Sequence, residues 1–346
     1  MKVSIITYHD EDNYGATLQA YVTYRVVKEL GFTPEIINLH MEHKESFVTK
    51  IAFGLKRLKF NCFRMKYMPN KTRLYKSVEE LRKDPPVSDV YLVGSDQTWN
   101  PAISKNYASA YFLDFGGEEQ RRISYASSFG IGSFDDSIFI KKEDVRRLLS
   151  RFVKLLVRED TGVQICKNEF GLEAIQVVDP VLLFPSYPEL TGPIEETNNI
   201  IVYKIKNDPE FYRRSVILGK NMDCNVRSIG SMRRLKGIKS SYPETVEKWI
   251  ANIASAKYVF TDSFHGTILS LLYHRQFVVY VGDPKNVNRI TTILRLLGLV
   301  DRICTNENTI EEIEIMLNKP INYNEVDVLL QTERHKSLEL LREAIG

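Results

Sequence analysis

Apolar and polar positions along the chain predict strands and helices in alternation. Short apolar runs rich in β-branched residues predict strands at 3–8, 90–93, 123–126, 153–157 and 175–178, and later at 200–205, 225–229, 258–261 and 277–281. Helical periodicity lies between these runs, for example at 16–30, and one long helix is predicted at 325–344. Near-continuous apolar strands separated by helices are typical of parallel sheets in α/β proteins.

The alternation is interrupted once, by four prolines within 180–193, which suits a linker. We therefore predict an N-terminal Rossmann-like domain at 1–185, a C-terminal Rossmann-like domain at 186–324, and a C-terminal helix at 325–346 that packs back on the first domain. Ligands of open α/β sheets bind at the carboxyl ends of the strands. With two such domains facing each other, we expect the binding site in the cleft between them.

Composition narrows the class of protein. The 346 residues are 43% hydrophobic and 26% charged, which is ordinary for a folded globular protein, and the net charge of +3 is too small to indicate nucleic-acid binding. The four cysteines lie far apart with no metal-ligand spacing, which predicts no metal site and a reducing compartment. No apolar run approaches the roughly 18 residues of a membrane span, and residues 1–8 predict a first strand rather than a signal peptide. We expect a cytoplasmic protein.

Candidate residues for binding an anion or a sugar follow the first two buried strands. After the strand at 3–8, Asn13 and Gly15 precede a helix whose free N–H groups can hold an anion or a sugar hydroxyl; the alternative is an ordinary capped helix. After the strand at 90–93, Ser95, Asp96 and Trp99 combine hydrogen-bonding groups with an aromatic face, a mixture that suits a sugar. Asp96 can serve as a general base, and the alternative is a turn with a buried tryptophan.

Candidate anion-binding residues follow later strands. Arg158 comes directly after the strand at 153–157 and can grip a carboxylate or phosphate, unless it forms a structural ion pair with Glu159 or Asp160. Arg289 lies near the start of a predicted helix and is either a second cation of the cleft or a solvated side chain. A basic cluster that follows the strand at 225–229 carries less weight: Arg227, Arg233, Arg234 and Lys236.

The turn after the strand at 258–261 is the most informative segment. His265 lies at a strand-to-helix turn, where the electropositive helix start suits a phosphate and an imidazole can act as a general acid. Ser263, Gly266 and Thr267 flank His265 and can complete an anion cradle. The alternative is a histidine that caps the helix.

Residues 50–76 form a basic, aromatic segment with nine lysine or arginine residues and no acidic residue. Apolar residues recur at helical spacing on one face, at Ile51, Leu55, Leu58, Cys62 and Met65. Such a helix either lies on an anionic membrane surface or packs its apolar face on the protein core and exposes a basic face.

Several segments together resemble the polysaccharide pyruvyl transferase family. In the family's order, over about residues 1–300, they are Asn13-Tyr14-Gly15-Ala16 with Gln19-Ala20, the runs 94–100 and 124–130, Val157-Arg158-Glu159 with Gly162, Asp179-Pro180, the run 261–267, Arg289-Ile290 and the run 296–299. The most specific of these is the run Thr261-Asp262-Ser263-Phe264-His265-Gly266-Thr267. Some family members carry an arginine two residues before the histidine, where this chain has Ser263.

The resemblance implies two Rossmann-like halves similar to B-type glycosyltransferases, an α/β fold. It implies transfer of a pyruvyl group from phosphoenolpyruvate to a sugar of a cell-surface polysaccharide precursor, forming a ketal with no metal or cofactor. It associates His265 and Arg158 with donor binding and catalysis and places Asp96 in the cleft. Because Ser263 lacks the arginine's charge, either another cation such as Arg289 meets the donor or the donor is held differently. A lipid-linked acceptor would bring the enzyme to the inner membrane surface. The alternatives are a glycosyltransferase that uses a nucleotide sugar and a non-catalytic polysaccharide-assembly binding protein.

Overall fold

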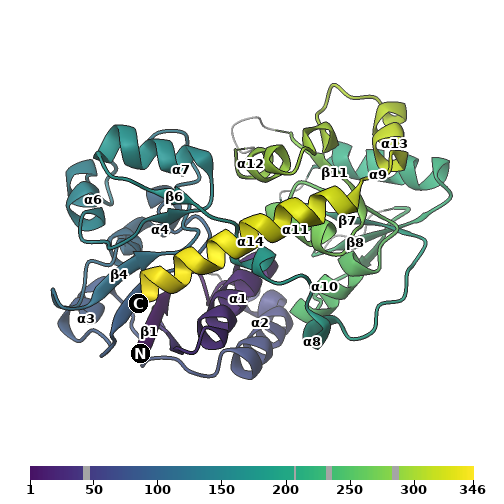
Figure 1. The fold of residues 1–346 in the computed structure, drawn as a ribbon. Helices are drawn as coiled ribbons and strands as arrows, with labels where there is room; N and C mark the ends of the chain where they lie inside the picture. The colour runs from purple at the N-terminus through teal and green to yellow at the C-terminus, as the bar shows by residue number, and fades with distance from the viewer. Residues whose placement is uncertain (42–46, 206–207, 231–235, 283–287) are drawn as a thin grey trace. The chain divides into compact units, whose positions relative to one another are not determined.

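The chain forms two compact units, shown as a ribbon in Figure 1. The computed structural model describes residues 1–41, 47–205, 208–230, 236–282 and 288–346. Unit 1 comprises Met1–Ala52, Asn61–Leu183 and Thr332–Gly346, and unit 2 comprises Phe53–Phe60 and Phe184–Gln331. The structure defines the geometry within each unit.

Unit 1 is built on a parallel sheet. Its four main strands are β1 (Lys2–Ile6), β2 (Thr33–Ile36), β3 (Val90–Val93) and β4 (Arg121–Ser124), in the order β2-β1-β3-β4. The short pair β5 (Leu156–Val157) and β6 (Ile175–Gln176) continues the layer through isolated bridges from Ile123 to Lys154 and from Ser127 to Val157. The order reverses between β1 and β3, and in open α/β sheets ligands bind at the carboxyl ends of strands at such a switch point.

Helices connect the strands of unit 1. They are α1 (Tyr14–Glu29), α2 (Phe47–Tyr67), α3 (Val78–Lys83), α4 (Pro101–Ser104), α5 (Ala108–Tyr111), α6 (Lys142–Leu149) and α7 (Asp160–Ile165). Residues Phe53–Phe60 of α2 are counted with unit 2. The last turns of helix α14 (Tyr323–Ile345) also belong to unit 1. There Ser337 Oγ accepts the N–H of Val178 at 3.1 Å, and Arg334 Nε donates to the carbonyl oxygen of Leu182 at 2.5 Å.

Unit 2 is built on a six-stranded parallel sheet in the order β12-β11-β10-β7-β8-β9. The strands are β7 (Asn199–Tyr203), β8 (Asn225–Ile229), β9 (Lys239–Ser241), β10 (Tyr258–Thr261), β11 (Gln276–Tyr280) and β12 (Ile303–Cys304). Numbered from β7, this order is 3-2-1-4-5-6 when read from the β9 end, the doubly wound Rossmann arrangement, and its switch point lies between β7 and β10.

The helices of unit 2 alternate with its strands. They are α8 (Pro188–Thr191), α9 (Pro209–Asn221), α10 (Val246–Ala254), α11 (Phe264–Leu272), α12 (Asn288–Leu296), α13 (Ile310–Asn318) and the first turns of α14. The core includes stacked rings of Phe211 and Phe260, with centroids 4.4 Å apart, and Tyr280 beside them. Helices and sheet therefore share one apolar interior, as a doubly wound fold requires.

The structure confirms most of the predicted strands. Those predicted at 90–93, 225–229 and 258–261 coincide with β3, β8 and β10, and the others overlap observed strands. The prediction missed β2, β9 and β12, which are short or polar and lie at a sheet edge. The edge strand β2 contains Pro34, a residue that sheets tolerate mainly at their edges and that weakens a strand pattern in sequence.

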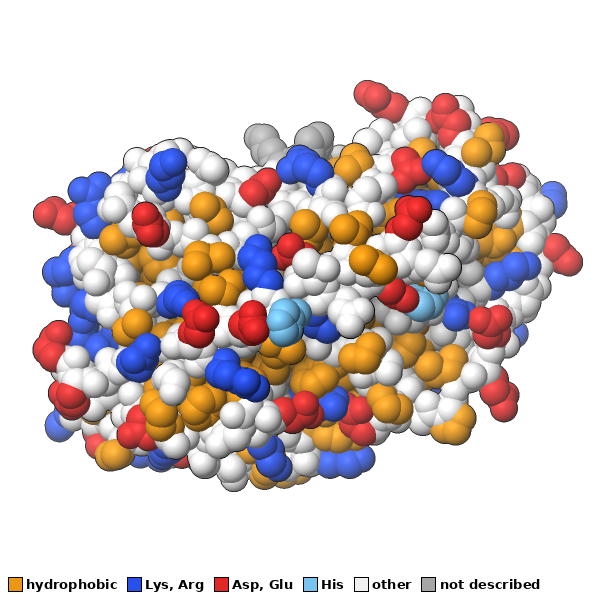
Figure 2. All heavy atoms as spheres, in the orientation of Figure 1, with side chains coloured by type: hydrophobic (Ala, Val, Ile, Leu, Met, Phe, Trp, Pro, Cys, Tyr) orange, Lys and Arg blue, Asp and Glu red, His pale blue; other side chains and the backbone are white. Residues whose placement is uncertain are grey.

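The surface carries charges of both signs. On the face shown in Figure 2, lysine and arginine side chains are interspersed with aspartate and glutamate. This mixture agrees with the small net charge of +3. Among the described residues, no helix is long and apolar enough to cross a membrane.

Candidate active site

The loop after β1 carries Asn13 and Gly15, which were predicted to help bind an anion or a sugar hydroxyl. Asn13 is the N-cap of α1, and its side-chain oxygen accepts the N–H of Ala16 at 3.1 Å. Gly15 is buried in the first turn of the helix. The side chain of Asn13 thus satisfies one of the helix's free donors, as the capped-helix alternative expects. Both residues lie at the switch point of unit 1. The backbone of this loop therefore lies where a ligand of such a sheet is expected to bind.

The loop after β3 holds Ser95, Asp96 and Trp99. Trp99 has no exposed surface; its Nε1 donates to the carbonyl oxygen of Tyr111 at 2.9 Å and its ring stacks on Phe112. It is a core residue of unit 1, and the alternative of a turn with a buried tryptophan fits this geometry. A sugar-stacking role, which requires an accessible ring face, does not.

Asp96 has a backbone conformation that is uncommon for a residue other than glycine. Its φ of 80° lies in the left-handed region, which aspartate tolerates better than most side chains. Its carboxylate accepts the N–H of Gln97 at 2.8 Å, and the side chain remains 18% exposed. Asp96 is therefore held in place and accessible, as a proton acceptor must be.

Arg158 is surrounded by three carboxylates. Its Nη1 lies 2.9 Å from Asp179 Oδ2, its Nη2 lies 3.7 Å from Asp96 Oδ1, and its Nε lies 3.7 Å from Glu159 Oε2. Burial lowers the pKa of Arg158, but the charges of Asp179, Asp96 and Glu159 outweigh burial, so the pKa is raised overall. One positive charge faces three negative ones, so Arg158 as placed orients Asp96 and neutralises buried carboxylates.

Two hydroxyl groups complete this buried network. Ser95 Oγ donates to Asp179 Oδ2 at 2.8 Å and accepts from Arg158 Nη1 at 3.3 Å. Ser128 Oγ donates to Glu159 Oε1 at 2.5 Å. The sequence suggested Glu159 or Asp160 as the partner of Arg158 in a structural ion pair. It did not identify Asp179, although Asp179 follows the strand predicted at 175–178. A carboxylate just after a neighbouring parallel strand was the signal that could have identified it.

In unit 2, the predicted anion cradle serves to cap α11. Ser263 Oγ accepts the N–H of Gly266 at 3.2 Å, and Thr267 Oγ1 donates back to the carbonyl oxygen of Ser263 at 2.9 Å. Gly266 is needed for close packing, since a Cβ there would lie 2.7 Å from Thr261 Oγ1. These contacts fix the helix start firmly beside β10.

His265 is the second residue of α11 and is 7% exposed. Its ring meets the ring of Phe264 edge to face, with centroids 5.4 Å apart. Because β10 lies beside β7 at the switch point of unit 2, His265 sits where the fold predicts a ligand. Arg289 lies in the first turn of α12 and is half-buried.

In the basic cluster after β8, Arg227 makes contacts that stabilise the fold. Arg227 Nη2 contacts the buried Glu244 at 3.1 Å and donates to Ser241 Oγ at 2.7 Å. Arg233 and Arg234 lie outside the described residues. Lys236 is exposed.

A buried lysine at the switch point of unit 2 was missed in the sequence. Lys204 follows β7, and its side chain is only 7% exposed. Its Nζ lies 2.8 Å from Asp262 Oδ2 and 3.9 Å from Asp208 Oδ2, above the rings of Phe211 and Tyr280. The signal was a lysine inside the run 200–205, which was predicted as a continuous strand. Its partner Asp262 is the residue directly before Ser263.

A histidine–aspartate pair at the switch-point side of unit 1 was also missed. His40 Nδ1 lies 2.6 Å from Asp10 Oδ2, and Arg64 Nη1 lies 3.7 Å from Asp10 Oδ1. Burial raises the pKa of Asp10, but the hydrogen bond from His40 and the charges of His9 and Arg64 lower it further than burial raises it. The polar run His9-Asp10-Glu11-Asp12 was the available signal. The pair borders a small hollow of about 30 Å³ that Tyr8 and Tyr111 also line.

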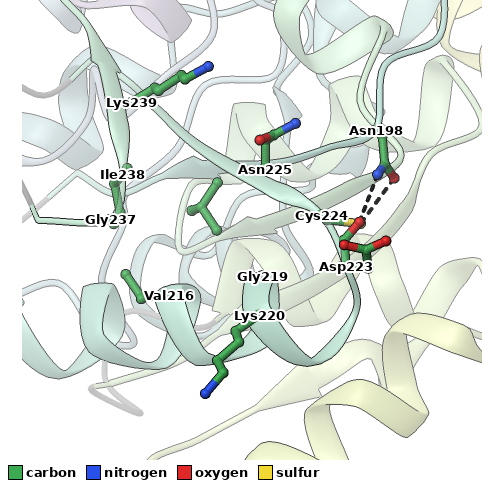
Figure 3. Close-up of a pocket in the computed structure, with 11 residues that line it drawn as sticks. Asn198, Val216, Gly219, Lys220, Asp223, Cys224, Asn225, Gly237, Ile238 and Lys239 are labelled. Atoms are coloured by element: carbon green, nitrogen blue, oxygen red, sulfur yellow. Dashed lines mark hydrogen bonds between the residues drawn. The ribbon is translucent and has the colours of Figure 1, made fainter.

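A larger hollow, of about 760 Å³, lies in unit 2. Figure 3 shows Asn198, Asp223, Cys224 and Asn225 in its wall, at the amino ends of β7 and β8. Asn198 Nδ2 donates to the carbonyl oxygen of Asp223 at 2.7 Å, and Cys224 Sγ donates to Asn198 Oδ1 at 3.2 Å. Since ligands of doubly wound sheets bind at the opposite, carboxyl ends of strands, this hollow lies away from the expected site. No cluster of potential metal ligands occurs among the described residues.

Two doubly wound units, each built on a parallel sheet, make up the fold of the B-type glycosyltransferases. In this protein, polar side chains lie at the switch point of each unit. The structure is similar to Arabidopsis thaliana UGT89C1 complexed with UDP-L-rhamnose, with a TM-score of 0.55 and 13% identity over 99% of this chain and 98% of that one. It is also similar to Medicago truncatula UGT71G1 complexed with UDP-glucose, with a TM-score of 0.53 and 9% identity over 100% and 98% of the two chains. At such low identity the likeness concerns the fold.

The sequence itself defines the family. No curated protein sequence matches the chain significantly. The profile of the family described as polysaccharide pyruvyl transferase matches residues 13–284, which is most of the chain. The chain belongs to this family, and it is therefore a transferase of polysaccharide biosynthesis.

Proposed function

We propose that this enzyme transfers the pyruvyl group of phosphoenolpyruvate to two hydroxyls of a sugar in a cell-surface polysaccharide precursor, releasing phosphate. The family match over residues 13–284 carries this proposal. The position of His265 and Asp96, each just after a strand that borders the switch point of its own sheet, supports it.

The reaction needs an acid and a base. A proton added to the methylene carbon of phosphoenolpyruvate gives an oxocarbenium-like centre at the neighbouring carbon. One sugar hydroxyl forms a bond to that centre, the bond to the phosphate oxygen breaks, and a second hydroxyl closes the ketal. The two hydroxyl protons balance the one taken up by the methylene and the one carried away by phosphate. His265 is the proposed acid and Asp96 the proposed base.

The charged side chains of the two units guide the assignment of a binding site for the donor, phosphoenolpyruvate. The donor carries a carboxylate and a phosphate, so its site needs cations. Arg158 is enclosed by three carboxylates, which favours a role in orienting Asp96 over a bidentate grip on the donor. Arg289, in unit 2 with His265, is the proposed donor cation in place of the arginine that some family members carry at the position of Ser263.

The test measures which product the enzyme releases. Purified enzyme is incubated with phosphoenolpyruvate and a panel of lipid-linked and synthetic glycosides that carry neighbouring hydroxyls. Acceptor-dependent phosphate release, with an acceptor that gains one pyruvate less one water, is the expected result. Nucleotide release from UDP-sugars, which are bound in the UGT89C1 and UGT71G1 structures, with no phosphate release from phosphoenolpyruvate, would instead identify a glycosyltransferase.

Variants assign the roles once turnover is established. His265→Asn should lower the turnover number by roughly 100- to 10,000-fold, the range of acid–base catalysis, while His335→Asn, at an exposed histidine of α14, should not. Asp96→Asn should cause a loss of the same order. If His40→Gln lowers turnover by this amount and Asp96→Asn does not, the base is His40, paired with Asp10. Near-normal turnover of His265→Asn would remove His265 from the mechanism.

A further inference from the structure

Helix α2 exposes an apolar stripe. Leu55, Leu58 and Met65 are 56%, 58% and 65% exposed, and Cys62 between them is exposed as well. The spacing of three, four and three residues places all four side chains on one face of the helix. Single exposed apolar residues are ordinary, but four in a row along one helix face mark an interaction surface.

The opposite face of α2 explains why this stripe points outward. Phe60, Phe63 and Arg64 are buried. Arg64 donates to the carbonyl oxygen of Glu11 at 2.6 Å and contacts Asp12 Oδ1 at 3.1 Å, both in the loop after β1. An amphipathic helix that only packs on its protein turns its apolar stripe to the core. Here the aromatic and arginine side chains occupy that side, so packing within the protein leaves the stripe uncovered.

Cations border the stripe on both sides. At 100° per residue, Arg57 lies to one side of Leu58 and Lys66 to the other. The whole segment 50–76 contains no acidic residue. Lysine and arginine stems can lie along an apolar surface while their charged ends reach outward. An apolar stripe flanked by cations is the arrangement of helices that lie in the plane of a membrane interface.

We propose that the outward face of α2 docks on a lipid surface that carries anionic headgroups. The apolar residues Leu55, Leu58 and Met65 enter the boundary between headgroups and acyl chains, and Arg57 and Lys66 meet the headgroup charges. Charge complementarity identifies the occupant, since this cationic border suits an anionic surface. The proposal concerns where the enzyme works and is independent of which donor it uses.

The test is binding of the full-length protein to vesicles. Sedimentation with vesicles of phosphatidylglycerol and phosphatidylcholine in equal parts should capture the protein, and vesicles of phosphatidylcholine alone should capture much less. The double variant Leu58→Glu and Met65→Glu should lower the partition coefficient by at least tenfold. Ile138→Glu with Val328→Glu changes two residues that are also well exposed, outside α2, and should bind as the unaltered protein does. Circular dichroism confirms that each variant is folded.

Two further measurements sharpen the outcome. Arg57→Gln and Lys66→Gln should each weaken binding about fivefold to the anionic vesicles, because one cation near such a surface contributes a factor of this order. An environment-sensitive dye on Cys62, with Cys224→Ser to limit labelling, should shift to the blue only with anionic vesicles. Unchanged binding of the Leu58→Glu and Met65→Glu variant would overturn the proposal. So would a protein that ignores vesicles but forms a dimer that this variant abolishes, since the stripe would then cover a second copy.

Discussion

Removing the charge of Asp179 tests whether Arg158 is held in a buried ion pair. The variant is Asp179→Asn, which keeps the size of the side chain. Arg158 Nη1 and Asp179 Oδ2 are 2.9 Å apart, and the two side chains are 2% and 0% exposed. At an effective dielectric constant of about 20, a pair at that distance attracts by about 6 kcal/mol. Breaking a buried pair by removing one partner typically costs about 3–5 kcal/mol, because the other charge stays buried.

The surroundings place the expected loss at the low end of that range. Asp96 and Glu159 remain 3.7 Å from the guanidinium, and each still attracts it by roughly 4 kcal/mol on the same estimate. Asp179 Oδ1 accepts the N–H of Val181 at 3.0 Å, and the side-chain amide oxygen of the Asp179→Asn variant can accept the same N–H. We expect Asp179→Asn to lower the free energy of unfolding of unit 1 by about 3 kcal/mol.

The assay follows unit 1 alone. The chain has two tryptophans, Trp99 in unit 1 and Trp249 in unit 2, so fluorescence in a Trp249→Phe background reports on unit 1 during urea unfolding. Asp84→Asn is the matched control in the same background. Asp84 pairs with Arg73 at 3.0 Å in an exposed ion pair, and its loss should cost below about 1 kcal/mol. Equal, small losses for both variants would refute the buried network around Arg158.

Two further predictions concern unit 2 and helix α2. Gly266→Ala should destabilise unit 2 by about 2 kcal/mol in urea unfolding, because the new Cβ would lie 2.7 Å from Thr261 Oγ1; Gly54→Ala, in open space on α2, should instead stabilise by roughly 0.5–1 kcal/mol. Burial raises the pKa of Glu244 more than its hydrogen-bond partners lower it. Glu244 therefore binds a proton more tightly in the folded protein than in the unfolded chain. The free energy of unfolding of the unaltered protein should fall relative to that of the Glu244→Gln variant as the pH rises from about 4 to 7. A constant difference in unfolding free energy across that range would contradict this.

The sequence predicted the architecture better than the roles of individual side chains. Buried strands such as β3, β8 and β10 are readable because their apolar runs depend only on local burial. The strands at sheet edges, such as β2 with its proline, lack that pattern. The class of fold and the placement of Asp96 and His265 after strands followed from the alternation alone, since the carboxyl ends of parallel strands hold the ligands of such sheets.

Side-chain roles were less predictable because they depend on partners that are distant in sequence. The sequence shows that Arg158 follows a buried strand, but not that the carboxylate of Asp179, 21 residues later, lies 2.9 Å from it. Ser263 and Thr267 are plausible phosphate ligands, yet they also cap a helix, and the two interpretations share one sequence pattern. Lys204 was hidden because one lysine at the end of an apolar run does not change the predicted strand.

The orientation of α2 shows how one buried charged side chain determines which face of a helix is exposed to solvent. Both faces of the helix carry apolar side chains, so periodicity identifies a stripe through Leu58 without determining which way it turns. Arg64 settles the orientation, because its Nη2 reaches Glu11 and Asp12 only if that face turns inward. A buried arginine without such acceptors would cost several kcal/mol, and this cost opposes any rotation that turns the stripe inward. The fold therefore fixes the apolar stripe outward through a polar interaction, and the free energy that covering the stripe would release is available to a lipid surface.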